Sequence, residues 1–275
     1  MVIKSGKCLA EEVKNTPVPY GSFAFWWLGQ LGYVFKLGEA VVYVDPYLAP
    51  YVARQVDPVL SPEDMAGASL LLGTHDHSDH IDNSVWGTLA KLDSDVVFVA
   101  PAPVTKDVCE RLEIAPERVI AAEENKTIDS CGIKIIPVAA AHEILEYVDG
   151  RSAFLSYIIE GNGCRILHCG DSCIYEGYIT KLKAFGKFDA IFVPINGRDA
   201  VRLRRNCIGN MTYQEAVDLA GTLAPTLTVP GHYEMFVNNS CDVELFRDYL
   251  DAKFPELKCW IGDHGQLVIF SAEDA

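Results

Sequence analysis

A short run of histidine and aspartate residues offers the clearest chemistry in the chain. Residues 74–80 read Thr-His-Asp-His-Ser-Asp-His and directly follow a short apolar run. His75 and His77 are two residues apart, so a tight turn can point both imidazoles at one ion, while Asp79 and His80 can reach a neighbouring ion. Mixed imidazole and carboxylate ligands suit Zn, Mn or Fe better than Ca or Mg, which prefer oxygen ligands throughout. The segment therefore predicts a metal site.

The spacing of these residues resembles the HxHxDH signature of the metallo-β-lactamase superfamily. That family has three further ligands downstream, and the chain offers a match to each of them in the same order. The resemblance implies a first metal group of His75, His77 and His142, a second group of Asp79, His80 and His232, and Asp171 as a bridge between the two. Asp45 resembles the family's aspartate that supports a ligand-bearing loop without binding the metal itself.

The resemblance also implies the chemistry of the site. One or two divalent ions per chain, Mn or Zn, would lower the pKa of a water and clamp both the attacking and the leaving oxygen. Asp79 and Asp171 would orient the metal-activated hydroxide, which makes them the candidate catalytic residues. We therefore expect a metal-dependent hydrolase.

Other polar side chains near these motifs have a structural interpretation. His168 competes with Asp171 as a ligand, but strand alternation points it the other way. His264 lies in a Gly-Asp-His-Gly sequence that is typical of a turn. Cys169 and Cys173 flank Asp171, and we favour apolar packing over soft-metal binding for both thiols.

Three segments narrow the resemblance to one branch of the superfamily. Residues 27–33 (Trp-Leu-Gly-Gln-Leu-Gly-Tyr), 193–199 (Val-Pro-Ile-Asn-Gly-Arg-Asp) and 230–236 (Pro-Gly-His-Tyr-Glu-Met-Phe) resemble the L-ascorbate-6-phosphate lactonase group. That group opens a phosphorylated sugar lactone. The second segment leads into a basic island, and guanidinium groups bind phosphate through paired hydrogen bonds. The candidate substrate-binding residues are Asn196, Arg198, Arg202, Arg204 and Arg205. A subunit interface or a solvated loop would also suit these arginines.

The expected reaction is the opening of a lactone or ester in a small anionic substrate such as a phosphorylated sugar. A small-molecule phosphodiesterase is the enzymatic alternative, because two metals clamp phosphoryl oxygens equally well. A metal-binding or sensory protein without turnover is the alternative outside enzymes. A redox di-iron branch of the family has Glu where this chain has His77, which disfavours oxidoreduction.

Composition sets the wider limits. The chain has 275 residues, 49% of them hydrophobic, and a net charge of −15, which disfavours nucleic acid as a partner. Nine cysteines lack the dense spacing of a disulfide scaffold, and residues 1–15 lack an apolar leader. The longest apolar runs have strand length, so we expect a cytoplasmic protein without a membrane partner. The sequence leaves open whether the protein forms a homo-oligomer.

The pattern of apolar runs and turn residues predicts the elements that must position the site. Strands are expected at Phe23–Leu28, Tyr33–Leu37, Ala40–Val44, Leu70–Gly73, Val96–Ala100, Thr127–Ile128, Ile133–Val138, Phe154–Glu160, Arg165–His168, Ala190–Ile195, Leu227–Val229 and Leu267–Phe270. Helices are expected at Val104–Leu112, Thr212–Leu223 and Val243–Ala252, the second opened by a capping box.

Every candidate ligand follows a strand, which collects the ligands on loops at one edge of stacked sheets. The predicted fold class is α/β, as a four-layer αββα sandwich of the metallo-β-lactamase type. We expect one hydrolase domain over residues 1–275.

Overall fold

Alternating side chains along the first long strand show how the core is divided. The structure is a computed structural model that describes residues 2–271. Phe23 and Phe25 belong to one hydrophobic cluster, whereas Ala24 and Trp26 belong to another. Side chains of a strand alternate between its two faces, so both faces of this strand are buried. Such a strand needs a second sheet on one face and helices on the other.

Two large sheets form the centre of the fold. The first has seven strands in the spatial order β17 (Val268–Ser271), β1 (Ser22–Gly29), β2 (Gly32–Leu37), β3 (Ala40–Val44), β4 (Leu70–Leu72), β5 (Val97–Pro101) and β6 (Val119–Ala122). The second has six strands in the order β16 (Leu227–Gly231), β15 (Ala190–Pro194), β14 (Cys164–His168), β13 (Leu155–Gly161), β8 (Ile133–Ala139) and β7 (Ile128–Ser130). Strands β3 to β6 pair in parallel, as do β14 to β16.

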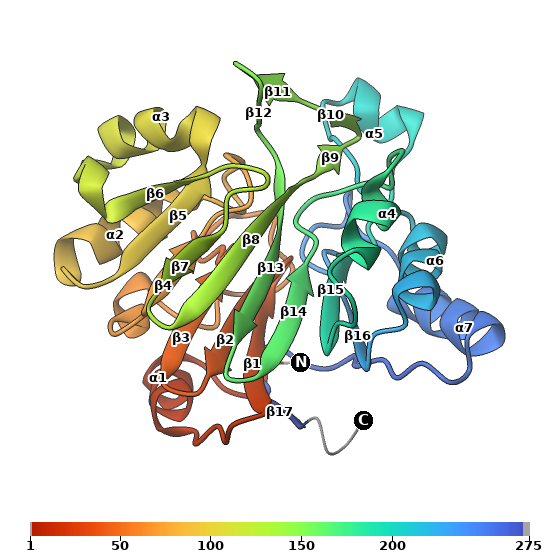
Figure 1. Ribbon diagram of the computed structural model, residues 1–275, viewed down its shortest axis with the longest axis horizontal. Helices are drawn as coiled ribbons and strands as arrows, with labels where there is room; N and C mark the ends of the chain where they lie inside the picture. The colour runs from red at the N-terminus through yellow and green to blue at the C-terminus, as the bar shows by residue number, and fades with distance from the viewer. Residues whose placement is uncertain (1, 272–275) are drawn as a thin grey trace.

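Helices cover the outer face of each sheet. On the first sheet lie α1 (Gly6–Asn15), α2 (Asn83–Leu92) and α3 (Ala102–Leu112), and on the second lie α4 (Tyr178–Lys183), α6 (Tyr213–Leu223) and α7 (Val243–Lys253). Figure 1 shows the two sheets side by side between α2 and α3 on one flank and α4, α6 and α7 on the other. This arrangement confirms the predicted αββα sandwich.

Short elements lie along one edge of the sandwich. The strand pairs β9 (Ala141–His142) with β10 (Ile144–Leu145) and β11 (Tyr147–Val148) with β12 (Arg151–Ser152) form two small hairpins there, next to α5 (Ala200–Arg204) in Figure 1. Two single turns of 3₁₀ helix, Pro62–Met65 and Pro116–Arg118, connect other elements. The edge with the short strands carries the candidate site.

Most predicted elements are present, with small shifts at their ends. The predicted capping box is confirmed, because the Thr212 hydroxyl accepts the backbone N–H of Glu215 and the Glu215 carboxylate accepts that of Thr212. Residues 161–163 form the hairpin turn between β13 and β14, with Asn162 and Gly163 both at positive φ. Helices α1, α2, α4 and α5 were not expected from the sequence. In α2 the Asp82 side chain accepts the N–H of Ser84 as the helix cap.

No helix within residues 2–271 is both long and apolar enough to cross a membrane. All nine cysteines are free thiols.

Candidate metal centre

Four segments bring the predicted ligands to one edge of the two sheets. Residues 73–80 follow β4, and His142 ends β9 just beyond β8. Asp171 follows β14, and His232 follows β16 directly. Each ligand thus leaves the end of a buried strand, as the sequence predicted.

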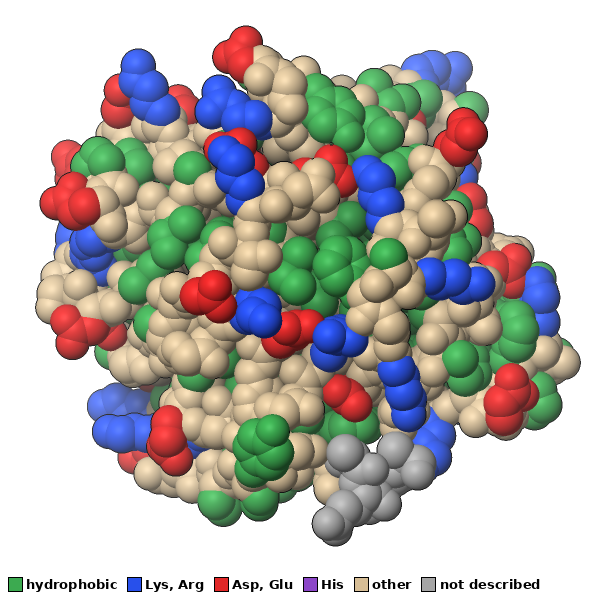
Figure 2. Space-filling model, in the orientation of Figure 1, with side chains coloured by type: hydrophobic (Ala, Val, Ile, Leu, Met, Phe, Trp, Pro, Cys, Tyr) green, Lys and Arg blue, Asp and Glu red, His purple; other side chains and the backbone are tan. Residues whose placement is uncertain are grey.

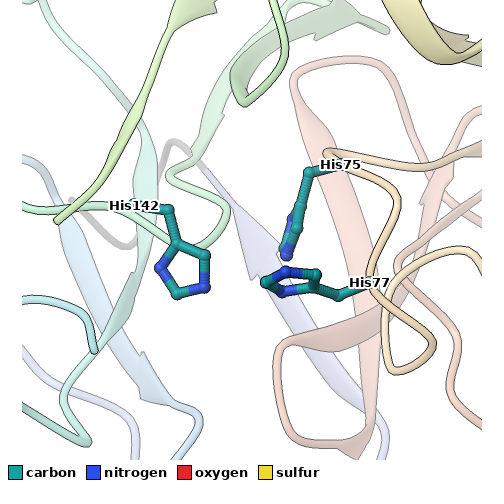
Figure 3. A group of neighbouring side chains, drawn as sticks. All are labelled: His75, His77 and His142. Atoms are coloured by element: carbon teal, nitrogen blue, oxygen red, sulfur yellow. The ribbon is translucent and has the colours of Figure 1, made fainter. Parts of the chain in front are cut away.

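Three histidines form the first group. One nitrogen from each of His75, His77 and His142 lies within 4.8 Å of the others. Figure 3 shows His142 facing His75 and His77 across a gap, with the two sides supplied by different segments. Nδ1 of His142 lies 3.0 Å from the carbonyl oxygen of Gly209, so it donates its proton there and leaves Nε2 free for a metal.

Asp79, His80 and His232 form the second group, again within 4.8 Å. Nε2 of His80 and Nε2 of His232 each lie 3.7 Å from Oδ2 of Asp79. Nδ1 of His80 lies 2.7 Å from Oδ2 of Asp45, so His80 also presents Nε2 to the site. Carboxylate support of this kind raises the basicity of a metal-binding imidazole.

Asp171 lies between the two groups. Its carboxylate oxygens are 3.6 Å from Nε2 of His142, 3.4 Å from Nε2 of His80 and 3.3 Å from Nε2 of His232. These gaps are long for hydrogen bonds, whereas ligand atoms around a tetrahedral ion with bonds of about 2.1 Å sit about 3.4 Å apart. The donor set therefore fits divalent metal binding, with Asp171 placed close to both groups.

Unpartnered atoms support the same fit. Nε2 of His75, Nε2 of His80 and Oδ1 of Asp171 are buried without a hydrogen-bond partner in the described structure. A buried polar atom without a partner costs free energy unless a ligand or ion satisfies it. All three atoms point into the ligand groups, so a cation would satisfy them together.

Burial keeps the first group neutral. It lowers the pKa of His75 well below its usual value, and the nearby charge of His80 lowers it further. Burial is also the main reason why the pKa values of His77 and His142 are lowered. Metals bind the neutral imidazole, so these rings need not lose a proton near neutral pH.

In the second group, nearby carboxylates outweigh burial in setting the pKa values of the histidines. Burial alone would lower the pKa of His80, but Asp171 and Asp45 outweigh it and raise that pKa well above the usual value. The pKa of His232 is raised for the same reason, chiefly by Asp171. Burial alone would raise the pKa of Asp171, yet His232 and His80 hold it well below the usual range. Cation binding would compete with protonation of these imidazoles.

Asp45 is buried and contacts the histidine loop. Its Oδ1 accepts the backbone N–H of Thr74 at 2.8 Å, and its Oδ2 accepts the Thr74 hydroxyl at 2.7 Å as well as His80. Asp82 extends this support, because its Oδ2 accepts the N–H groups of Leu48 and Ala49. Asp82 was not among the expected site residues, although it lies two residues after His80 in sequence.

A cavity of about 370 Å³ opens onto the centre, and His77, Asp79, His142, Asp171 and His232 line part of it. The other lining residues are Asp76, Ser78, Asn206, Cys207, Ile208 and Asn239. None of the histidines can be seen on the molecular face shown in Figure 2, where acidic and basic side chains are interspersed. Most of the candidate ligands are buried, and Asp79, with 22% of its side chain exposed, lines the cavity.

Two of the predicted substrate-binding arginines are engaged within the protein. Arg198 makes a paired contact with Glu215, at 2.6 and 2.7 Å, and also donates to the carbonyl of Asn210. Arg202 contacts Asp199 at 2.6 Å and donates to the carbonyl of Asn196 at 2.7 Å. The hydrogen bonds of both guanidinium groups connect parts of the segment 196–210, which includes α5. Both arginines therefore have a structural role that the sequence did not suggest.

The remaining predicted substrate residues differ from one another. Asn196 is buried, and its amide contacts Asn239 and Asn210. Arg204 and Arg205 are exposed at the end of α5, next to the cavity-lining Asn206. None of the five candidates lines the cavity itself. Their role in substrate binding stays a prediction.

The side chains that were interpreted as structural are placed as expected. His168 lies away from the ligand groups, with Nε2 2.8 Å from the Leu31 carbonyl. His264 stacks on Trp27 and contacts Glu234. Cys169 and Cys173 are buried, and burial raises the pKa of the Cys169 thiol to about 12, which disfavours a thiolate ligand.

Three contacts to the ligands escaped sequence reasoning. The Phe154 ring lies against all three histidines of the first group, at centroid distances of 5.1 Å to His75, 6.0 Å to His77 and 5.4 Å to His142. Gln30 donates to Asp79 from the turn between β1 and β2. Gly209 orients His142. Nothing near these residues in sequence signals a ligand, because the contacts join distant segments.

Comparisons with known proteins agree with this geometry. A family model described as "Beta-lactamase superfamily domain" matches residues 41–233. A protein of Pyrococcus abyssi named as a metal-dependent hydrolase is 26% identical over 223 residues, covering 79% of this chain and 91% of its own. A Salmonella choleraesuis protein named "Probable L-ascorbate-6-phosphate lactonase" is 25% identical over 297 residues, covering 92% and 81%.

Solved structures share the fold at lower identity. The metallo hydrolase Igni18 of Ignicoccus hospitalis superposes with a TM-score of 0.72 at 17% identity, covering 91% of this chain and 99% of its own. An isothiocyanate hydrolase from Delia radicum gut bacteria superposes with a TM-score of 0.71 at 15% identity, covering 90% and 100%. The match over residues 41–233 includes every predicted metal ligand. The chain therefore belongs to the beta-lactamase superfamily and is related to its metal-dependent hydrolases.

Proposed function

We propose that this superfamily hydrolase opens a lactone ring or cleaves an ester in a small anionic molecule, with a phosphorylated sugar as the favoured class. Two divalent ions, Mn or Zn, would be held by His75, His77, His142, Asp79, His80, His232 and Asp171. The observation that carries the proposal is the convergence of these residues at one cavity, which five of them line, with Asp171 between the two groups. The similarity to a protein named as a lactonase supports the choice of reaction.

When bound, the cations would lower the pKa of a water and polarise the substrate carbonyl. The protein's own residues would fix the geometry and handle the proton. Asp79 is the more exposed of the two ligand carboxylates, so it can accept a proton from the attacking water and return it to the leaving oxygen. Asn206 and Asn239 offer amides to substrate hydroxyls from the cavity wall.

The anionic end of the substrate would be bound by Arg204 and Arg205. Both residues are exposed and directly precede the cavity-lining Asn206 in sequence, whereas Arg198 and Arg202 already have carboxylate partners. A remote phosphate contact would orient the substrate without taking part in the bond change. This division of roles leaves two arginines for the substrate and two for the loop.

The test is hydrolysis by purified protein reloaded with Mn²⁺ or Zn²⁺, with a chelator control. L-ascorbate 6-phosphate, unphosphorylated L-ascorbate, an aryl ester and bis-p-nitrophenyl phosphate form the substrate panel. Chelator-sensitive opening of the phosphorylated lactone supports the proposal, as does a raised KM for that substrate alone in the Arg204→Gln/Arg205→Gln variant. Turnover of the phosphodiester alone would replace the proposal with a phosphodiesterase. Metal binding without turnover of any substrate would point to a non-catalytic protein.

A further inference from the structure

The tight turn between β1 and β2 reaches the metal centre through one side chain. Gln30 lies in this turn at a φ of 52°, and its accessible surface is 0%. Its Nε2 lies 3.0 Å from Oδ2 of Asp79, a residue 49 positions away. An ionised carboxylate can only accept, so the amide must present its N–H₂ to Asp79.

The same oxygen faces the second metal group. Oδ2 of Asp79 is the atom that lies 3.7 Å from Nε2 of both His80 and His232. A carboxylate oxygen has two lone pairs, so it can accept from Gln30 and still bind a cation. The hydrogen bond therefore fixes the direction in which Asp79 offers its remaining lone pair.

The backbone of Gln30 holds a second ligand. Its carbonyl oxygen accepts the backbone N–H of His232 at 2.8 Å and the indole N–H of Trp27 at 3.0 Å. Its own N–H donates to Glu234 at 3.1 Å, just beyond His232. His232 itself has a φ of 60°, a conformation that non-glycine residues adopt only when their surroundings enforce it.

Close packing leaves this turn little freedom. A Cβ added at Gly231 would lie 2.8 Å from a Leu31 methyl group and 3.0 Å from the Gln30 carbonyl oxygen. A Cβ at Gly32 would lie 2.7 Å from the carbonyl oxygen of Asp45. The turn thus packs tightly between the segment that carries His232 and the segment that carries Asp45, whose carboxylate contacts His80.

We propose that Gln30 is a positioning residue for the second metal ion, because it fixes the Asp79 carboxylate and the His232 backbone at the same time. Gln30 does not touch the first group, whose rings are oriented by Gly209 and Phe154. The two ions should therefore depend on Gln30 unequally. The inference rests on the two-metal centre of the proposed function and needs no particular substrate.

The experiment is a Zn²⁺ and Mn²⁺ titration of the metal-free full chain by chelator competition and calorimetry. Gln30→Met keeps the length of the side chain and removes the amide donor. Gln30→Asn keeps the amide and suits the positive φ, but its donor no longer reaches Asp79. Gln55→Met is the matched control, because Gln55 is exposed and its side chain donates only to the Ala53 carbonyl.

We expect both Gln30 variants to bind the second ion about 10- to 100-fold more weakly while the first ion binds as in the wild type. Co²⁺ absorption should report the change in the second site alone. The inference would be overturned if the affinities of both ions fell equally and the melting temperature of the metal-free protein also fell. Gln30 would then have a general role in folding. Unchanged titrations would overturn the inference outright.

The two proposals can fail separately. A wild-type chain that binds only one ion would overturn this inference and the two-metal centre together. Failure to open any lactone would overturn the proposed reaction, while the titration would still decide the role of Gln30.

Discussion

Nδ1 of His142 donates to the carbonyl oxygen of Gly209, so a ligand on one side of the cavity is oriented by the loop on the other side. Gly209 in turn donates its N–H to Glu143, the neighbour of His142. A Cβ at Gly209 would lie 2.2 Å from Cβ of Arg198, so the arginine packs directly on this peptide. The Arg198–Glu215 pair thus fixes the loop that orients His142.

Arg198→Gln should therefore weaken metal binding. Loss of the paired contact with Glu215 loosens the 196–210 loop, and supports of this kind are worth about 10- to 100-fold in metal affinity. Chelator competition measures the effect, and Arg204→Gln serves as the control because Arg204 is exposed. Normal metal affinity with a raised KM for a phosphorylated substrate would instead restore the substrate role predicted from sequence.

The same ion pair predicts a pH dependence of stability. Burial alone would raise the pKa of Glu215, but the Arg198 hydrogen bond outweighs it and the net shift is downward. A carboxyl group with a lowered folded-state pKa stabilises the fold above its unfolded pKa, about 4.3, and this contribution is lost as the pH falls through the folded-state value. Urea unfolding of wild type and Glu215→Gln should therefore differ most above about pH 5 and converge in acid. A gap that stays constant with pH would contradict this.

Asp45→Asn should weaken binding of the second ion by about 10- to 100-fold. The amide replaces a carboxylate that accepts from His80 and from Thr74 at once, so His80 loses the charge that makes it a stronger ligand. Metal titration checks this, with Asp57→Asn at an exposed position as the control. Wild-type affinity in Asp45→Asn would show that the His80 ring is fixed by packing alone.

Asp171→Asn should have the largest effect on the centre. The Asp171 carboxylate lies within 3.6 Å of Nε2 of His80, His142 and His232, so its charge serves both groups. We expect turnover to fall about 100-fold or more, with fewer ions retained. In the wild type, a chelator should abolish turnover and added Mn²⁺ or Zn²⁺ should restore it. Full activity of the variant, or of chelated wild type, would refute the metal mechanism.

Phe154→Ala should separate packing from ligation in the first group. The ring contacts three ligand imidazoles and is half-buried, so its removal should cost about 1–3 kcal/mol of unfolding free energy. The first ion should bind more weakly, and Phe154→Leu should restore most of both losses. Unfolding curves and metal titrations of the metal-free protein measure the two effects. An unchanged first-ion affinity would assign Phe154 to stability alone.

The candidate metal ligands could be identified from the sequence because residue type, spacing and chain order all carry the signal. His75, His77, Asp79 and His80 are close in sequence, and a buried strand precedes them, as it does His142, Asp171 and His232. The roles of Arg198 and Gln30 were not predictable in the same way. Arg198 acts through Glu215, 17 residues away in sequence. Gln30 acts through Asp79, 49 residues away, and only folding brings each pair together. Composition and periodicity do not encode such pairings.

The cavity has two kinds of wall. Residues 76–79 line one part of the cavity and include candidate metal ligands. Residues 206–208 and Asn239 line another part, and no candidate ligand is among them. Side chains on the second wall can therefore change in size or polarity without displacing a ligand atom, provided that Gly209 keeps its backbone contacts. A library restricted to Asn206, Cys207, Ile208 and Asn239 would sample new specificities on an intact catalytic centre.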